Sequence, residues 1–189
     1  MRNKLIENSS PLPSKWVVLL DSDIYFDLSV FQGLFSVHPT KNGIGFLSAY
    51  SVQGFRVKNV RKQLKIDQEI SDDQIITFGH YYDTFAFVDK DNQNYYPECR
   101  FDVCKQCTST RTIKTTNQPF ILVRSAFDGL AIIRTDILHN PKIKWNTINL
   151  FNKYSLCEHV CFCDAIHSAT DYKVAIATSV RGKMYWLSG

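Results

Sequence analysis

The stretch SKWVVLLDSDIYF, residues 14–26, decides the fold class that the sequence predicts. Its first part, Lys15–Leu20, is short, apolar and partly β-branched, which is typical of a buried β-strand. Asp21 and Asp23 follow directly, and in open α/β sheets ligands gather at the carboxyl ends of the strands. Carboxylate oxygens suit hard cations such as Mg²⁺ and Mn²⁺. We therefore expect Asp21 and Asp23 to hold one of these ions; the alternative is a solvated turn that caps the next helix.

Strand and helix patterns alternate along the rest of the chain. Further strands are expected at Gly43–Val52, Tyr81–Val88, Phe120–Val123, Leu130–Ile133 and Lys173–Val180. Helices are expected at 27–38, 135–139 and Glu158–Ile166, with an exposed loop or helix at Lys58–Asp73. Residues 89–118 are polar, aromatic and cysteine-bearing without a clear period, which is typical of a functional loop. The alternation predicts the α/β class.

The helix expected at 27–38 has a cap and a face that the sequence defines. Asp27 or Ser29 is the expected cap, because short polar side chains bond the first free N–H groups of a helix. The apolar residues that share one face at helical spacing are Leu28, Phe31, Leu34 and Phe35.

The composition is that of one soluble globular domain over residues 1–189. A chain of 189 residues is about one domain, and its 44% hydrophobic and 21% charged residues are ordinary. The net charge of +4 does not predict a nucleic-acid partner and suits an anionic small ligand at least as well. No apolar run approaches the ~18 residues of a membrane helix, and the N-terminus has no secretory pattern. We expect a cytoplasmic protein with no transmembrane segment.

Five segments, in order along residues 2–165, resemble motifs of nucleotide-sugar glycosyltransferases with the GT-A fold. They are Arg2-Asn3-Lys4-Leu5, the stretch around Asp21–Asp23, His80–Ala86, Ser125–Ala131 and Cys157–Val160. The resemblance is to fungal capsule-type mannosyltransferases and to glycosyltransferase domains of large DNA viruses. It implies a mixed sheet flanked by helices. It also implies transfer of a hexose from a UDP- or GDP-linked sugar to a hydroxyl of a glycan or protein.

The resemblance implies roles for four carboxylates. Asp23 is implied as a ligand of Mn²⁺ or Mg²⁺, with Asp21 helping it or contacting the ribose. Glu158 is the candidate base that takes the proton of the acceptor hydroxyl in an inverting transfer. The alternative for Glu158 is a charge favoured by the dipole at a helix N-terminus. Asp128 is the rival candidate base.

Four further residues are implied at the site. Tyr82 and Asp83 are candidates for binding the donor sugar or the acceptor, and Arg2 is a candidate for binding a phosphate. His167 is the candidate histidine ligand of the metal. The alternative for each is an ordinary structural or solvated residue.

The chain departs from the resembled pattern in two ways. A GT-A fold carries a nucleotide-binding half before its metal motif, whereas only 20 residues precede Asp21 here. The expected fold therefore lacks most of that N-terminal half. In addition, Asp128 stands where the resembled loop often has Gly, which places a carboxylate near the expected acceptor.

The cysteines allow two interpretations. The six are Cys99, Cys104, Cys107, Cys157, Cys161 and Cys163. The spacing of Cys104 and Cys107 is that of a zinc knuckle, and two of the later cysteines would complete a zinc site. The other interpretation is a set of buried free thiols, with one disulfide if the compartment is oxidising.

Two other function classes stay open. An aspartate-based phosphohydrolase also carries Asp-x-Asp after its first strand, where the first Asp attacks phosphorus. Two residues after the second Asp, phosphohydrolases of this kind have Thr or Val, whereas this chain has Tyr25. They also have a downstream loop with paired Asp residues, and the Asp pair here, Asp72 and Asp73, lies in the charged stretch. The second class is a truncated, inactive transferase-like module that binds a glycan or a partner. Metal-dependent consumption of a nucleotide sugar separates this module from an active enzyme.

Overall fold

The computed structural model of residues 1–189 describes a large part of the chain. The described residues are 14–65, 68–81, 83, 86–91, 118–146, 149–150, 154–155, 157–181 and 183–188. Arg2, Tyr82, the first three cysteines and most of the predicted loop 89–118 lie outside the described residues.

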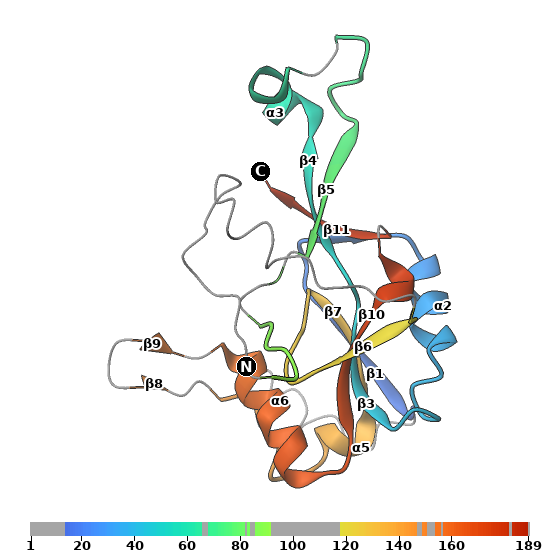
Figure 1. Cartoon of the computed structure of the whole chain (residues 1–189), viewed down its shortest axis with the longest axis vertical. Coiled ribbons are helices and arrows are strands. Elements are labelled where there is room, and N and C mark those ends of the chain that lie inside the picture. The colour runs from blue at the N-terminus through green and yellow to red at the C-terminus, as the bar shows by residue number, and fades with distance from the viewer. Residues whose placement is uncertain are drawn as a thin grey trace.

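The main sheet has five strands in the order β1-β7-β3-β10-β6 (Figure 1). The strands are β1 (Trp16–Leu20), β7 (Leu130–Arg134), β3 (Ile44–Ser48), β10 (Lys173–Ala177) and β6 (Phe120–Val123). β10 runs parallel to β3, and the other neighbouring pairs are antiparallel. Together with the helices, this mixed sheet confirms the predicted α/β class.

A second sheet has four strands in the order β2-β11-β4-β5. They are β2 (Ile24–Phe26), β11 (Met184–Ser188), β4 (Val52–Arg56) and β5 (Ile75–Tyr81). β8 (Asn149–Leu150) and β9 (Tyr154–Ser155) form a separate small hairpin. β4 and β5 extend away from the main sheet toward α3 (Val57–Leu64) at one end of the molecule (Figure 1).

Helices cover the main sheet and complete the core. They are α2 (Ser29–Ser36), α5 (Thr135–Leu138), α6 (Glu158–Ala169) and the short 3₁₀ helix η1 (Thr178–Val180). In Figure 1, α6 and α2 lie on opposite sides of the main sheet. The fully buried Phe162 of α6 faces Phe46 of β3 and stacks on Trp145 at a ring-centroid distance of 3.7 Å. None of the helices in the described ranges is long and apolar enough to cross a membrane.

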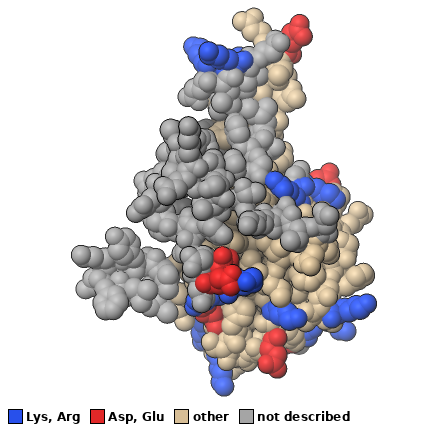
Figure 2. Space-filling view, in the orientation of Figure 1, with Lys and Arg blue, Asp and Glu red and all other residues tan. Residues whose placement is uncertain are grey.

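Some of the basic side chains lie at the end of the molecule that carries α3. Figure 2 shows Lys and Arg there and also across the rest of the visible surface, with acidic side chains in both places. Two of these arginines pair with acidic residues, Arg61 with Asp72 at 2.7 Å and Arg56 with Asp73 at 3.7 Å. The local positive charge of this cluster is therefore partly neutralised.

The structure corrects the expected buried strand at Lys15–Leu20. β1 is an edge strand that pairs, among the described strands, only with β7. One of its faces is open, with Val18 44% and Leu20 47% exposed. The apolar run predicts burial of both faces of the strand. In the structure, no described element packs against its outer face.

The expected strand Gly43–Val52 is in fact two strands. β3 ends at Ser48 and β4 begins at Val52. Ala49 still follows the register of β3 with β7, because its N–H bonds the carbonyl of Leu130. The partner changes at Ser51, whose N–H bonds the carboxylate of Asp128. The apolar pattern alone does not reveal this change of partner.

The expected strand Tyr81–Val88 is wrong. The strand there is β5, which ends at Tyr81. Beyond it, the carboxylate of Asp83 accepts the N–H of Ala86 at 3.2 Å. Val88 makes an isolated bridge with Ser125 outside the named strands. A side-chain carboxylate that bonds nearby backbone competes with strand pairing.

Two helical and C-terminal details also differ from expectation. In α2 the buried residues are Val30, Gly33 and Leu34, while Leu28 is 76% exposed before the first turn. The N-cap residue is Leu28, without a side-chain cap bond, and not Asp27 or Ser29 as expected. Asp27 stands one residue earlier, where its carboxylate accepts the N–H of Ser29 at 2.7 Å. The expected last strand, Lys173–Val180, ends at Ala177 and is followed by η1.

Candidate functional site

A left-handed turn at Asp128 and Gly129 is the centre of the candidate site. Asp128 has φ +59° and Gly129 has φ +77°, immediately before β7. A Cβ on Gly129 would lie 2.4 Å from Cγ1 of Ile24, so only glycine fits there. Aspartate is among the few residues with a side chain that visit this conformation.

The carboxylate of Asp128 is fully buried and held from two directions. Ser51 donates to it twice, with its backbone N–H to Oδ2 and with its hydroxyl to Oδ1. Asp83 and Asp128 exchange bonds, because the N–H of each donates to the carboxylate of the other, at 3.3 and 3.2 Å. The structure thus brings together two of the predicted site residues, Asp83 and Asp128.

Burial, and secondly the charge of Asp83, raise the pKa of Asp128 well above its usual range. The bonds from Ser51 and from the N–H of Asp83 act in the opposite direction and are outweighed. The protonated form of Asp128 therefore persists to higher pH than that of an exposed aspartate. A buried carboxyl that favours its protonated form is poorly suited to accept a proton from a bound acceptor.

Two aromatic side chains enclose this carboxylate pair. Tyr50 and Tyr81 are buried and meet edge to face, with ring centroids 5.3 Å apart. Burial is the main cause that raises the pKa of each phenol, and the charge of Asp128 adds to it. The guanidinium of Arg181 lies over the ring of Tyr50, 5.5 Å from its centroid. Asp128 is thus buried beside two buried aromatic rings, and this burial is the main cause of its raised pKa.

The Asp-Ser-Asp motif lies beside the same turn. The N–H of Asp21 bonds the carbonyl of Gly129 at 2.8 Å, which fixes the end of β1 against the turn. Asp23 is exposed, and its Oδ2 accepts a hydrogen bond from the indole Nε1 of Trp186 at 2.7 Å. Both carboxylates therefore stand at the carboxyl end of β1, as the sequence predicts.

The two carboxylates at this end of β1 are oxygen donors, which is the type of ligand that hard divalent cations prefer. Mg²⁺ is commonly bound by one or two carboxylates, with water and substrate phosphates completing the shell. Within the described ranges, no three His, Cys, Asp or Glu side chains gather to hold a metal by themselves. Asp21 and Asp23 are the residues that would hold Mg²⁺ or Mn²⁺ in this part of the chain.

Glu158 begins α6 close to the same loop. Its side chain is 42% exposed, and its Oε1 lies 3.9 Å from Nε2 of His159. The imidazole of His159 stacks on Phe127, with ring centroids 3.9 Å apart and planes 8° from parallel. This stack joins the first turn of α6 to the residue before Asp128. Glu158 is therefore an accessible carboxylate near the site, while its place in the first turn also suits the helix dipole.

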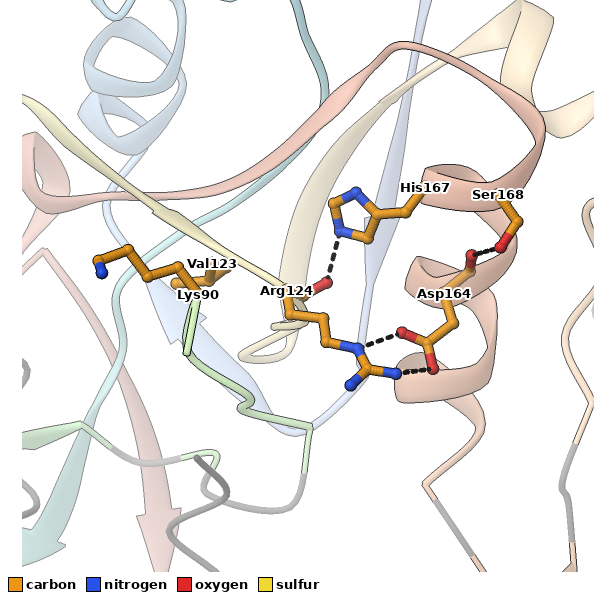
Figure 3. Close-up of a pocket in the computed structure, with 6 residues that line it drawn as sticks. All are labelled: Lys90, Val123, Arg124, Asp164, His167 and Ser168. Atoms are coloured by element: carbon orange, nitrogen blue, oxygen red, sulfur yellow. Dashed lines mark hydrogen bonds and ion pairs between the residues drawn. The ribbon is translucent and has the colours of Figure 1, made fainter. Parts of the chain in front are cut away.

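His167 lies elsewhere, in a pocket of about 500 Å³ between the end of β6 and the last turns of α6 (Figure 3). The pocket is lined by Lys90, Val123, Arg124, Asp164, His167 and Ser168. Nε2 of His167 is 2.9 Å from the carbonyl oxygen of Arg124, whose guanidinium forms a two-pronged pair with Asp164. β6 is at the opposite edge of the main sheet from β1. The structure therefore does not bring His167 together with Asp23.

The described cysteines are free thiols of α6 and the residue before it. Cys161 and Cys163 are buried, and burial raises the pKa of Cys163 to about 12. Within the described ranges they form no cluster with other metal-binding side chains. The cysteines of the expected zinc knuckle lie outside those ranges, so the zinc interpretation stays a prediction.

Two residues that contact the carboxylates of the site are not indicated by the local sequence. Ser51 and Trp186 hold the carboxylates of Asp128 and Asp23, but both act across long sequence separations, and no local signal marks them. The turn itself has a signal, because an Asp-Gly dipeptide favours positive φ. No protein-family model matches the chain, and no curated protein matches it.

Proposed function

We propose that this protein is a metal-dependent glycosyltransferase that moves a hexose from a nucleotide diphosphate sugar to a hydroxyl of a glycan or protein. One observation carries the proposal. The segments around Asp21, Asp83, Asp128 and Glu158, which resemble glycosyltransferase motifs, come into direct contact although they are far apart in the sequence. The contacts are the Asp21–Gly129 bond, the Asp83–Asp128 exchange and the Phe127–His159 stack.

The proposed roles follow from burial and charge. Asp21 and Asp23 bind the cation, which neutralises the negative charge of the leaving diphosphate when it is bound. Asp83 and Asp128 fix the loop beside them through their mutual bonds. Glu158, the partly exposed carboxylate, is the proposed base of an inverting transfer.

The proposed chemical step is a substitution at the anomeric carbon of the donor. The acceptor oxygen forms a bond to that carbon, and the bond from carbon to the diphosphate oxygen breaks. The electron pair of the broken bond leaves with the diphosphate, and the acceptor proton goes to Glu158. The protein contributes mainly by holding the two substrates in line and by stabilising the departing charge.

The proposal is tested with the purified chain, Mn²⁺ and a panel of UDP- and GDP-linked sugars. A ligand that binds only the folded chain raises its thermal unfolding midpoint. We expect a rise that needs both Mn²⁺ and one nucleotide sugar, together with release of the nucleotide diphosphate. Asp23→Ala should abolish both. Asp171→Ala is the matched control, because Asp171 is an exposed aspartate in the turn after α6.

Two results would contradict the proposal. Binding without release of the diphosphate, even with added glycan acceptors, would instead favour a transferase-like binding module. Hydrolysis of a phosphate ester that depends on Asp21 would favour the phosphohydrolase.

A further inference from the structure

We infer that Trp186 is a positioning residue for the proposed metal site, where its indole N–H holds the carboxylate of Asp23. The contact is short, with 2.7 Å between Nε1 of Trp186 and Oδ2 of Asp23. It spans 163 positions of sequence and joins β11 to the turn that precedes β2. The inference rests on the proposed function, because it assigns a task to Trp186 at the same cation site.

The register of the second sheet places the indole at the aspartate. β11 lies between β2 and β4, and Trp186 pairs with Ile24, the residue after Asp23. On the other face of the same strands, Tyr25 and Tyr185 stack with their rings 1° from parallel. Met184 at the start of β11 is fully buried. Strand pairing, ring stacking and burial therefore all fix the register of Trp186 against β2.

An indole is chemically suited to this task. Its N–H is a donor only, so Trp186 orients the carboxylate without competing for the cation. The bond engages Oδ2 of Asp23, so Oδ1 is the oxygen that the inference assigns to the cation. Groups that hold a metal-binding carboxylate in place commonly change metal affinity about 10- to 100-fold when they are removed.

The two aspartates of the motif are held by different parts of the fold. Asp21 is fixed through its backbone N–H to Gly129 in the turn before β7, and Asp23 through its side chain to β11. Removing the indole should therefore loosen Asp23 alone. The expected defect is in cation affinity, with the rest of the site unchanged.

The experiment measures Mn²⁺ binding by the loss of the free-ion paramagnetic resonance signal, with Mn²⁺ alone and with Mn²⁺ plus UDP or GDP. Trp186→Phe keeps an aromatic ring but removes the donor. We expect its dissociation constant for Mn²⁺ to rise about 10- to 100-fold. Trp16→Phe is the matched control, because Trp16 is a half-buried tryptophan at the start of β1. It should bind Mn²⁺ as the unaltered chain does.

A second measurement keeps the inference testable if Trp186→Phe does not fold. In a Trp16→Phe, Trp145→Phe chain, Trp186 is the remaining tryptophan, and Mn²⁺ bound at Asp23 should quench its fluorescence, with Mg²⁺ reversing the effect. Asp23→Ala should remove the quenching. Mn²⁺ binding that depends on Asp23 but is unchanged in Trp186→Phe, or that leaves Trp186 fluorescence unquenched, overturns the inference alone. Absence of any Mn²⁺ binding that depends on Asp23 overturns the proposed function as well.

Discussion

Replacing Asp128 by Asn should change how the stability of the protein depends on pH. Asparagine has nearly the same shape and, like aspartate, tolerates the positive φ of +59° at this position. Its amide oxygen still accepts the N–H of Ser51, and its NH₂ group can donate to the Ser51 hydroxyl. The N–H of Asp83, which donates to Oδ1 at 3.3 Å, then faces the NH₂ group and loses its acceptor, and this cost does not depend on pH. The substitution keeps a residue that tolerates the turn and removes the ionisable group.

The sign follows from proton linkage. In the folded chain the pKa of Asp128 is raised well above the ordinary value of 3.8, chiefly by burial. Between these two pKa values the folded state holds a proton that the unfolded state has lost, so the free energy of unfolding falls as pH rises. The contribution of Asp128 to the free energy of unfolding is fully present below its pKa in the unfolded chain. It is lost as pH rises through its pKa in the folded chain. Each pH unit in this window costs up to about 1.4 kcal/mol.

The assay is urea unfolding of the unaltered chain and of Asp128→Asn at several pH values from 4 to 8. We expect the unaltered chain to lose stability relative to Asp128→Asn as pH rises, at up to about 1.4 kcal/mol per pH unit. Asp136→Asn is a control of opposite sign, because a bond from Arg134 lowers the pKa of Asp136. Its loss of stability should be nearly constant from pH 4 to 8 and should vanish only when the series is extended to pH values well below 3.8. If the free energies of unfolding of the unaltered chain and of Asp128→Asn change with pH in parallel, the reasoning about Asp128 is refuted.

Three further predictions concern the turn, a thiol and the proposed base. Gly129→Ala should lower the free energy of unfolding, measured with urea, by about 2–5 kcal/mol, because of the positive φ and the clash with Ile24. In an Ile24→Ala background the loss should be smaller. Cys163, with its pKa raised to about 12, should resist iodoacetamide at pH 8 until urea is added, and mass spectrometry of the alkylated chain would reveal early labelling. Glu158→Gln should reduce release of the nucleotide diphosphate about 10²- to 10⁴-fold while Asp128→Asn retains it; the reverse order would make Asp128 the base.

The elements that the sequence predicts well are those whose local pattern matches their final surroundings. β6, β7 and α6 lie where apolar runs and helical spacing place them, because their burial follows from residues close together in the chain. β2 and β11 were not predicted. β2 has three residues, and β11 becomes a strand through partners more than a hundred positions away.

The sequence predicts several residues of the candidate site but not the contacts between them. Asp83 and Asp128 are both predicted site residues, but nothing local indicates that each bonds the backbone of the other. The role of Ser51 depends on the break between β3 and β4, which the continuous apolar pattern conceals. Side chains that act over long separations are determined by the tertiary fold, so a single sequence does not reveal them.

The pairing of β11 with β2 has a consequence for the order of events during synthesis. Asp23 leaves the ribosome before its partner Trp186, which follows 163 positions later. At about 5–20 residues per second, the interval is on the order of 10 s. During that time β2 has no β11 beside it, and contacts of such long range also form slowly once both strands exist. The aspartate motif is therefore made well before the strand that holds Asp23 in place.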